Sequence, residues 1–105
     1  MAVKPPQIYM ATLGSLGRVI RGAEITEAQA VLERFAERDI VVCGPDRKAN
    51  RRLAYRIESQ RGPCKDEPPH EKSGPYALPH YQPEPRPPEG HSFYETEKRK
   101  AARNP

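Results

Sequence analysis

The apolar and polar positions in the first half of the chain predict two amphipathic helices flanking one short strand. Apolar residues recur at spacings of three and four over residues 26–38, with charged residues opposite them, which indicates a helix with one core-facing stripe. Thr26 and Gln29 have the spacing of a capping box, so the helix is expected to begin at Thr26. The predicted core-facing stripe consists of Ala28, Val31, Leu32 and Phe35.

A short β-branched run and a second periodic segment follow. Residues 40–43 are apolar and end before Gly44 and Pro45, which favours a buried strand. Asp46 is a suitable N-cap for a second helix over residues 46–59. The residues expected to face the core are Ala49, Leu53 and Ile57.

The second half of the chain is rich in proline, which limits regular structure there. Residues 1–60 hold three prolines and residues 61–105 hold ten, and proline is excluded from central strand positions. Two short strands still fit, and a hairpin would pair them. The expected segments are a lead-in at 1–23 with an edge strand at 7–10, strands at 76–82 and 91–96, a loop at 83–90, and a charged tail at 97–105.

These elements predict an α+β fold with two N-terminal helices around a short strand, followed by a small proline-rich antiparallel sheet. One small domain is expected over residues 24–96, after the lead-in and before the tail. Apolar residues make up only 35% of the chain, so its core is expected to be thin.

The charge distribution favours a polyanionic partner. The formal net charge is +4 and the pI about 9.3. Residues 46–61 contain six basic and two acidic residues, a difference equal to the whole excess. This stretch is either a solvated basic helix or a phosphate-facing surface, helped by the free N–H groups at a helix start.

Several functional classes are disfavoured. Cys43 and Cys64 are not in a CxxC pair, and Cys43 is interpreted as a buried apolar residue. No membrane-spanning stretch or signal peptide is found. His70 precedes Glu71, but the chain lacks the cysteine pair of a zinc deaminase. No cofactor is predicted, and neither Ser73 nor Ser92 lies in a nucleophile elbow.

The strongest candidate chemistry is acid–base catalysis by two histidines. His80 and His91 lie beside aromatic residues in the two predicted strands, and a hairpin would bring them together. Two imidazoles and a cation suffice for RNA transphosphorylation, with one ring accepting the 2′-hydroxyl proton and the other protonating the leaving oxygen. Ring nitrogens within about 8 Å could flank one phosphate. A metal site formed by His70, His80 and His91 is the less favoured alternative, because the short ligand spacing of such sites is missing.

Three segments resemble C-terminal toxin domains of bacterial polymorphic toxins. They are Asp39–Arg51 (DIVVCGPDRKANR), Gly74–Pro83 (GPYALPHYQP) and Gly90–Tyr94 (GHSFY), and the likeness covers about residues 24–96. Many such modules belong to the barnase/EndoU/colicin/RelE-like ribonucleases, which need no metal and place catalytic residues on a small antiparallel sheet after one or two helices.

The resemblance implies a ribonuclease toxin with an RNA substrate and a cognate immunity protein. It also implies delivery in a larger or secreted protein, interbacterial competition and action in the target-cell cytoplasm. The candidate catalytic residues are His80, His91, Arg47 and Tyr94. The candidate nucleic-acid-binding residues are Lys48, Arg51, Arg52, Tyr81 and Arg86. The alternatives are a non-catalytic nucleic-acid-binding or adaptor protein that uses the basic 46–61 surface, and a metal-dependent DNase toxin.

Overall fold

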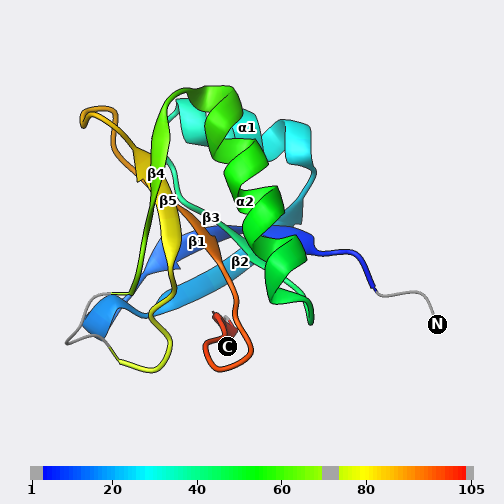
Figure 1. Cartoon of the computed structure of the whole chain (residues 1–105). Helices are drawn as coiled ribbons and strands as arrows, with labels where there is room; N and C mark the ends of the chain where they lie inside the picture. Colours follow the sequence, from blue (N-terminus) through cyan, green and yellow to red (C-terminus); the bar gives the residue numbers. More distant parts are fainter. Residues whose placement is uncertain (1–3, 70–73, 104–105) are drawn as a thin grey trace.

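The protein is built on one seven-stranded mixed sheet in the computed structural model, which describes residues 4–69 and 74–103 (Figure 1). The strand order is β4-β5-β6-β3-β1-β2-β7. The strands are β1 (Gln7–Leu13), β2 (Val19–Ile25), β3 (Ile40–Cys43), β4 (Cys64–Glu67), β5 (His80–Pro83), β6 (Ser92–Tyr94) and β7 (Ala102–Arg103). Neighbouring strands are antiparallel except that β3 is parallel to β6 and β2 is parallel to β7.

Two helices, α1 (Glu27–Phe35) and α2 (Arg47–Arg61), pack against each other over one face of this sheet (Figure 1). Thr26 and Gln29 form the expected capping box at the start of α1. The Asp46 side chain accepts two backbone N–H groups at the start of α2. Both predicted helix starts are therefore confirmed, and β3 occupies the predicted strand at 40–43.

The predicted architecture is wrong, because strands dominate and the helices are not an N-terminal pair around one strand. Two strands precede α1, and β1 lies inside the strand order between β3 and β2 instead of at an edge. The sheet is mixed instead of antiparallel, since the connection through α2, β4 and β5 returns the chain to lie parallel to β3. The lead-in and the tail contribute β1, β2 and β7 to this same sheet.

The predicted core-facing stripe of α1 is also wrong. The Leu32 and Phe35 side chains are 67% and 58% exposed, and Val31 is half-buried against the core. The buried positions of α1 are Ala30 and Arg34. The helix is rotated in this way because the Arg34 guanidinium pairs with Glu58 of α2, an attraction that apolar periodicity does not detect. In α2, by contrast, Leu53 and Ile57 are buried as predicted.

The opposite face of the sheet is covered by irregular chain. Leu78 and Ala101 pack with Val41 and Phe93 in a second apolar cluster. The Tyr76 carbonyl accepts the backbone N–H of Val19, which holds the segment before β5 against β2. Within the described residues, neither α1 nor α2 combines the length and apolar character that crossing a bilayer requires.

Candidate active site

The structure brings His80 and His91 into contact. β5 and β6 pair as predicted, with His80 directly opposite Phe93, but both strands are shorter than the predicted 76–82 and 91–96, and His91 lies just before β6. The two imidazole centroids are 4.7 Å apart with nearly perpendicular planes, and both rings also contact the Phe93 ring. The two rings are therefore close enough for both to lie within reach of one bound phosphate. The third histidine, His70, lies outside the described residues, as does Ser73.

Asp39 holds the His91 ring in one orientation. The carboxylate precedes β3, and its Oδ1 atom accepts the backbone N–H of His91 at 2.8 Å and lies 3.1 Å from Nδ1 of the ring. The Nε2 atom lies 3.3 Å from an Arg86 guanidinium nitrogen. A neutral ring that donates from Nδ1 to Asp39 satisfies both contacts, because Nε2 then accepts from Arg86. Asp39 is a functional candidate that sequence reasoning missed, and only its position before the buried strand could have marked it.

His80 has a different environment and favours the neutral form. Its Nδ1 lies 3.3 Å from the Leu78 carbonyl oxygen and its Nε2 lies 3.1 Å from the Gln82 side-chain oxygen. Burial lowers the pKa of His80 below its ordinary value, and the nearby charge of His91 lowers it further. The two imidazoles are thus in contact but differ in their hydrogen-bond partners, an arrangement that suits one base and one acid.

A buried network of charged side chains lies on the helix side of β6. Arg34 and Glu58 are both 0% exposed, and the guanidinium makes two hydrogen bonds to the carboxylate. Glu58 also accepts from Arg61 and from the Ser92 hydroxyl, the residue after His91. Arg34 additionally donates to the backbone carbonyls of Arg38 and Glu89, which fastens the loop leading to His91. The buried network therefore fixes the backbone from which His91 projects.

Gly90 is required where this loop meets the network. Its φ is +98°, in the region that favours glycine. A Cβ atom added to Gly90 would lie 2.3 Å from a guanidinium nitrogen of Arg34, closer than any real contact. The glycine thus allows the loop backbone to pass directly over the buried arginine.

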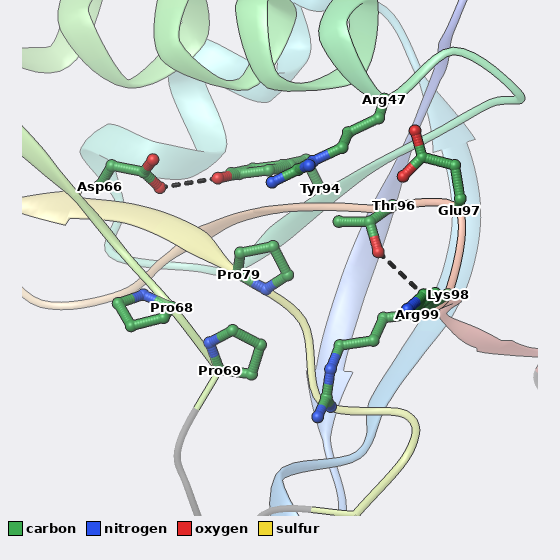
Figure 2. Close-up of a pocket in the computed structure, with 10 residues that line it drawn as sticks. All are labelled: Arg47, Asp66, Pro68, Pro69, Pro79, Tyr94, Thr96, Glu97, Lys98 and Arg99. Carbon is green, nitrogen blue, oxygen red and sulfur yellow. Dashed lines mark hydrogen bonds between the residues drawn. The ribbon is translucent and has the colours of Figure 1, made fainter.

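Arg47 and Tyr94 do not join the histidines. Residues alternate across β6, so Phe93 packs on the histidine face while Tyr94 packs in the core beneath the helices. The Tyr94 hydroxyl donates to Asp66 at 2.8 Å, and its pKa is raised by burial and by that hydrogen bond to the carboxylate. Figure 2 shows Arg47 extending from α2 toward Tyr94. The predicted catalytic set therefore divides into two pairs on different faces of the sheet.

The predicted nucleic-acid-binding residues divide in the same way. Arg86 lies beside His91, whereas the others surround a hollow of about 360 Å³ on the outer side of α2. Tyr55, which sequence reasoning missed, lines this hollow with half its surface exposed and its ring 5.4 Å from Tyr81. Arg51 donates to the Tyr81 hydroxyl and pairs with Asp66. The hollow is lined by Lys48, Arg51, Arg52, Tyr55 and Tyr81.

The described residues include two free thiols and no cluster of possible metal ligands. Cys43 and Cys64 are both free, and burial raises the pKa of Cys43 to about 12, so this thiol is not a nucleophile near neutral pH. Among residues 4–69 and 74–103, no three His, Cys, Asp or Glu side chains are grouped as metal ligands.

Comparison with known proteins identifies no relative of this chain: no protein-family model matches, and no curated protein or solved structure is detectably similar. The resemblance to polymorphic-toxin ribonucleases stays a prediction.

Proposed function

We propose that the chain is a metal-independent endoribonuclease whose acid–base pair is His80 and His91. The observation that carries the proposal is the contact between the two imidazoles, together with Asp39 on one ring and Arg86 beside it. A carboxylate that orients one histidine next to a second histidine with a lowered pKa is a suitable arrangement for moving two protons in one reaction.

The roles of the histidines follow from their surroundings. Neutral His80 keeps its proton on Nδ1, which donates to the Leu78 carbonyl, and accepts the proton of the ribose 2′-hydroxyl at Nε2, where the substrate replaces the Gln82 side chain. The 2′-oxygen then forms a bond to phosphorus, and the bond from phosphorus to the 5′-oxygen breaks. His91, held at Nδ1 by Asp39, carries a proton on Nε2 when the bound substrate replaces its contact with Arg86, and supplies that proton to the leaving oxygen. The products are a 2′,3′-cyclic phosphate and a 5′-hydroxyl end.

Arg86 is the cation for this reaction in place of Arg47. Its guanidinium reaches His91 from the loop between β5 and β6 and is partly exposed, so a phosphate can contact both residues. Stabilisation of the charge that develops on the phosphorane is an electrostatic role suited to arginine. Phe93 supports both histidine rings from below.

The remaining parts of the proposal come from the family resemblance. We assign the chain to the polymorphic-toxin effectors, with an RNA substrate in the target-cell cytoplasm, a cognate immunity protein and delivery in a secreted or larger protein. A bacterium that expresses the chain without a partner gene should lose viability, and His91→Ala should restore growth. Equal toxicity of both forms would contradict a catalytic toxin.

The direct test is cleavage of labelled RNA by the purified chain in excess EDTA. His80→Ala and His91→Ala should each reduce the rate by about 10²- to 10⁴-fold, and His70→Ala is the matched control because it removes the third histidine. Undiminished cleavage by both variants would exclude the mechanism. If the chain instead cleaves DNA, and does so only after a divalent metal is added, the metal-dependent DNase alternative is favoured.

A non-catalytic nucleic-acid-binding function is the second candidate, favoured by the basic hollow on α2. Exposed tyrosine beside Lys48, Arg51 and Arg52 is suited to stacking a base next to phosphate-binding cations. This alternative predicts salt-sensitive RNA binding that Arg51→Glu with Arg52→Glu weakens, with the RNA recovered intact. Recovery of cleaved RNA distinguishes the first function from the second.

A further inference from the structure

A cavity of about 530 Å³ lies beside Tyr94 (Figure 2), and neither His80 nor His91 is among its lining residues. It is open to solvent on one side and is lined by the start of α2, the region around β4, the end of β6 and the turn at residues 96–99. This turn is closed by hydrogen bonds between Thr96 and Arg99 in both directions. A volume of this size is typical of pockets that bind small organic ligands.

The cavity has an excess of available positive charge. Arg47 and Lys98 line it, and among the described residues neither side chain forms an ion pair. Arg99 adds a third cation, whose guanidinium holds the carbonyls of Gly74 and Ala77. Within residues 4–69 and 74–103, at least two of the three cations therefore have no carboxylate partner and can pair with an anion.

Two carboxylates also line the cavity, and one of them is already neutralised. Asp66 accepts from the Tyr94 hydroxyl through one oxygen and pairs with Arg51 through the other. Glu97 is exposed in the turn at residues 96–99. Asp66 retains lone pairs for an additional N–H donor, because a carboxylate can accept several hydrogen bonds.

One wall of the cavity is apolar. Pro68 and Pro69 follow β4, Pro79 precedes β5, and Figure 2 shows the three rings gathered below the Asp66–Tyr94 hydrogen bond. The Pro79 backbone is fixed by its carbonyl, which accepts the N–H of Tyr94. Saturated rings of this kind offer a surface against which a flat heteroaromatic group can pack without losing hydrogen bonds.

We propose that this cavity binds a ribonucleoside monophosphate, with the phosphate at Arg47 and Lys98 and the base against the three prolines. Exocyclic amino groups of the base can donate to Asp66, which the Tyr94 hydroxyl and Arg51 hold in place. The nucleotide is either free or the phosphorylated end of an RNA chain, since both present the same group. The inference does not rest on cleavage at His80 and His91.

The test is isothermal titration of the purified full chain with AMP, GMP, CMP and UMP, beside adenosine and inorganic phosphate. At least one monophosphate should bind with a Kd below about 1 mM, and at least tenfold more tightly than adenosine or phosphate alone. Arg47→Gln should weaken this binding at least tenfold. Arg56→Gln removes the same charge from α2 at a position outside the cavity and should leave the Kd within about twofold.

The outcomes separate the inference from the proposed ribonuclease. His91→Ala should abolish cleavage and leave nucleotide binding intact. Equal weakening by Arg47→Gln and Arg56→Gln, absence of binding by every monophosphate, or equal affinity for inorganic phosphate would each overturn the nucleotide assignment. A trinucleotide with a 5′-phosphate that binds more tightly than both its 5′-hydroxyl form and the free nucleotide identifies the RNA end as the source; the reverse order identifies the free nucleotide.

Discussion

Two pairs, each formed by a carboxylate and a basic side chain, lie on opposite sides of the chain at residues 91–92. Comparing them shows that this protein uses one pair for stability and offers the other for chemistry. On the helix side, Arg34 and Glu58 are 0% exposed and are linked to Ser92. On the other side, Asp39 and His91 are 19% and 22% exposed and reach Arg86. The sealed pair cannot exchange protons readily with solvent or substrate, so it acts as a structural link. The open pair can, so it is suited to catalysis.

The largest effect is expected when the sealed pair is broken. Glu58→Gln leaves the Arg34 and Arg61 guanidinium groups without their carboxylate in a dry site, and should cost about 3–5 kcal/mol of unfolding free energy. Urea denaturation followed by circular dichroism measures this loss. The control is Glu33→Gln, which removes a carboxylate from the exposed pair with Arg38 and should hardly move the midpoint. Similar midpoints for both variants would refute the distinction.

The helix side can also be tested at its apolar residues. Leu53→Ala empties a buried position of α2 and should cost about 2–5 kcal/mol, whereas Leu32→Ala on the exposed side of α1 should change stability by less than about 0.5 kcal/mol. Thermal or urea unfolding measures the loss of unfolding free energy in each variant, and so compares the same substitution on two helices. A larger loss for Leu32→Ala would restore the apolar stripe predicted from the sequence.

The open pair should respond in activity and not in stability. Asp39→Asn keeps the shape of the side chain but weakens the support of protonated His91, and should lower kcat for RNA cleavage by about 10²-fold. Tyr94→Phe removes the hydroxyl on the other face and should leave kcat within about twofold. Single-turnover cleavage assays measure both. A comparable loss in Tyr94→Phe would return that residue to the catalytic set.

The smallest expected effect is a change in pH dependence at His80. Its folded pKa is lowered by burial and by His91, so between this value and about 6.5 the unfolded state binds more protons. The stability contributed by neutral His80 is present above about pH 6.5 and is lost as the pH falls through the folded pKa. His80→Gln should therefore reduce the slope of unfolding free energy against pH. Parallel curves for the two proteins would show that His80 titrates normally in the fold.

The effect of His91 on the pKa of His80 can be tested more directly by NMR. Replacement of His91 by glutamine removes the second cause of the lowered pKa, so the pKa of His80 should rise toward its ordinary value. A proton NMR titration of the His80 ring measures this shift directly. An unchanged pKa would show that burial alone accounts for the lowering, and would weaken the case that the two rings act as a coupled acid and base.

Local elements were predictable because their signals are local. Thr26 and Asp46 act on backbone N–H groups two or three residues away, so the helix starts could be found without tertiary information. Alternation along the predicted strand at 91–96 places His91 and Phe93 on one face, and their rings are stacked in the structure. The hairpin followed from one connecting loop, and this placed His80 beside His91.

The long-range arrangement was not predictable from these patterns. The position of β1 inside the sheet depends on backbone pairing with β3, and hydrogen bonding between strands carries little sequence signature. Arg34 is charged, so periodicity assigned it to the solvent side of α1, although Glu58 makes its burial favourable. Asp39 could not be recognised as a partner of His91, which lies 52 residues later.

By itself, the sequence determined the two helices, the buried strand β3 and the pair of histidines on one hairpin, because capping, periodicity and strand alternation act within a few residues. Only the tertiary structure decided which groups meet. It joined Asp39 and Arg86 to His91, moved Arg47 and Tyr94 to a separate cavity, and turned the apolar side of α1 outward. The physical reason is that ion pairs and strand pairing depend on distance in space, which neighbouring residues do not encode.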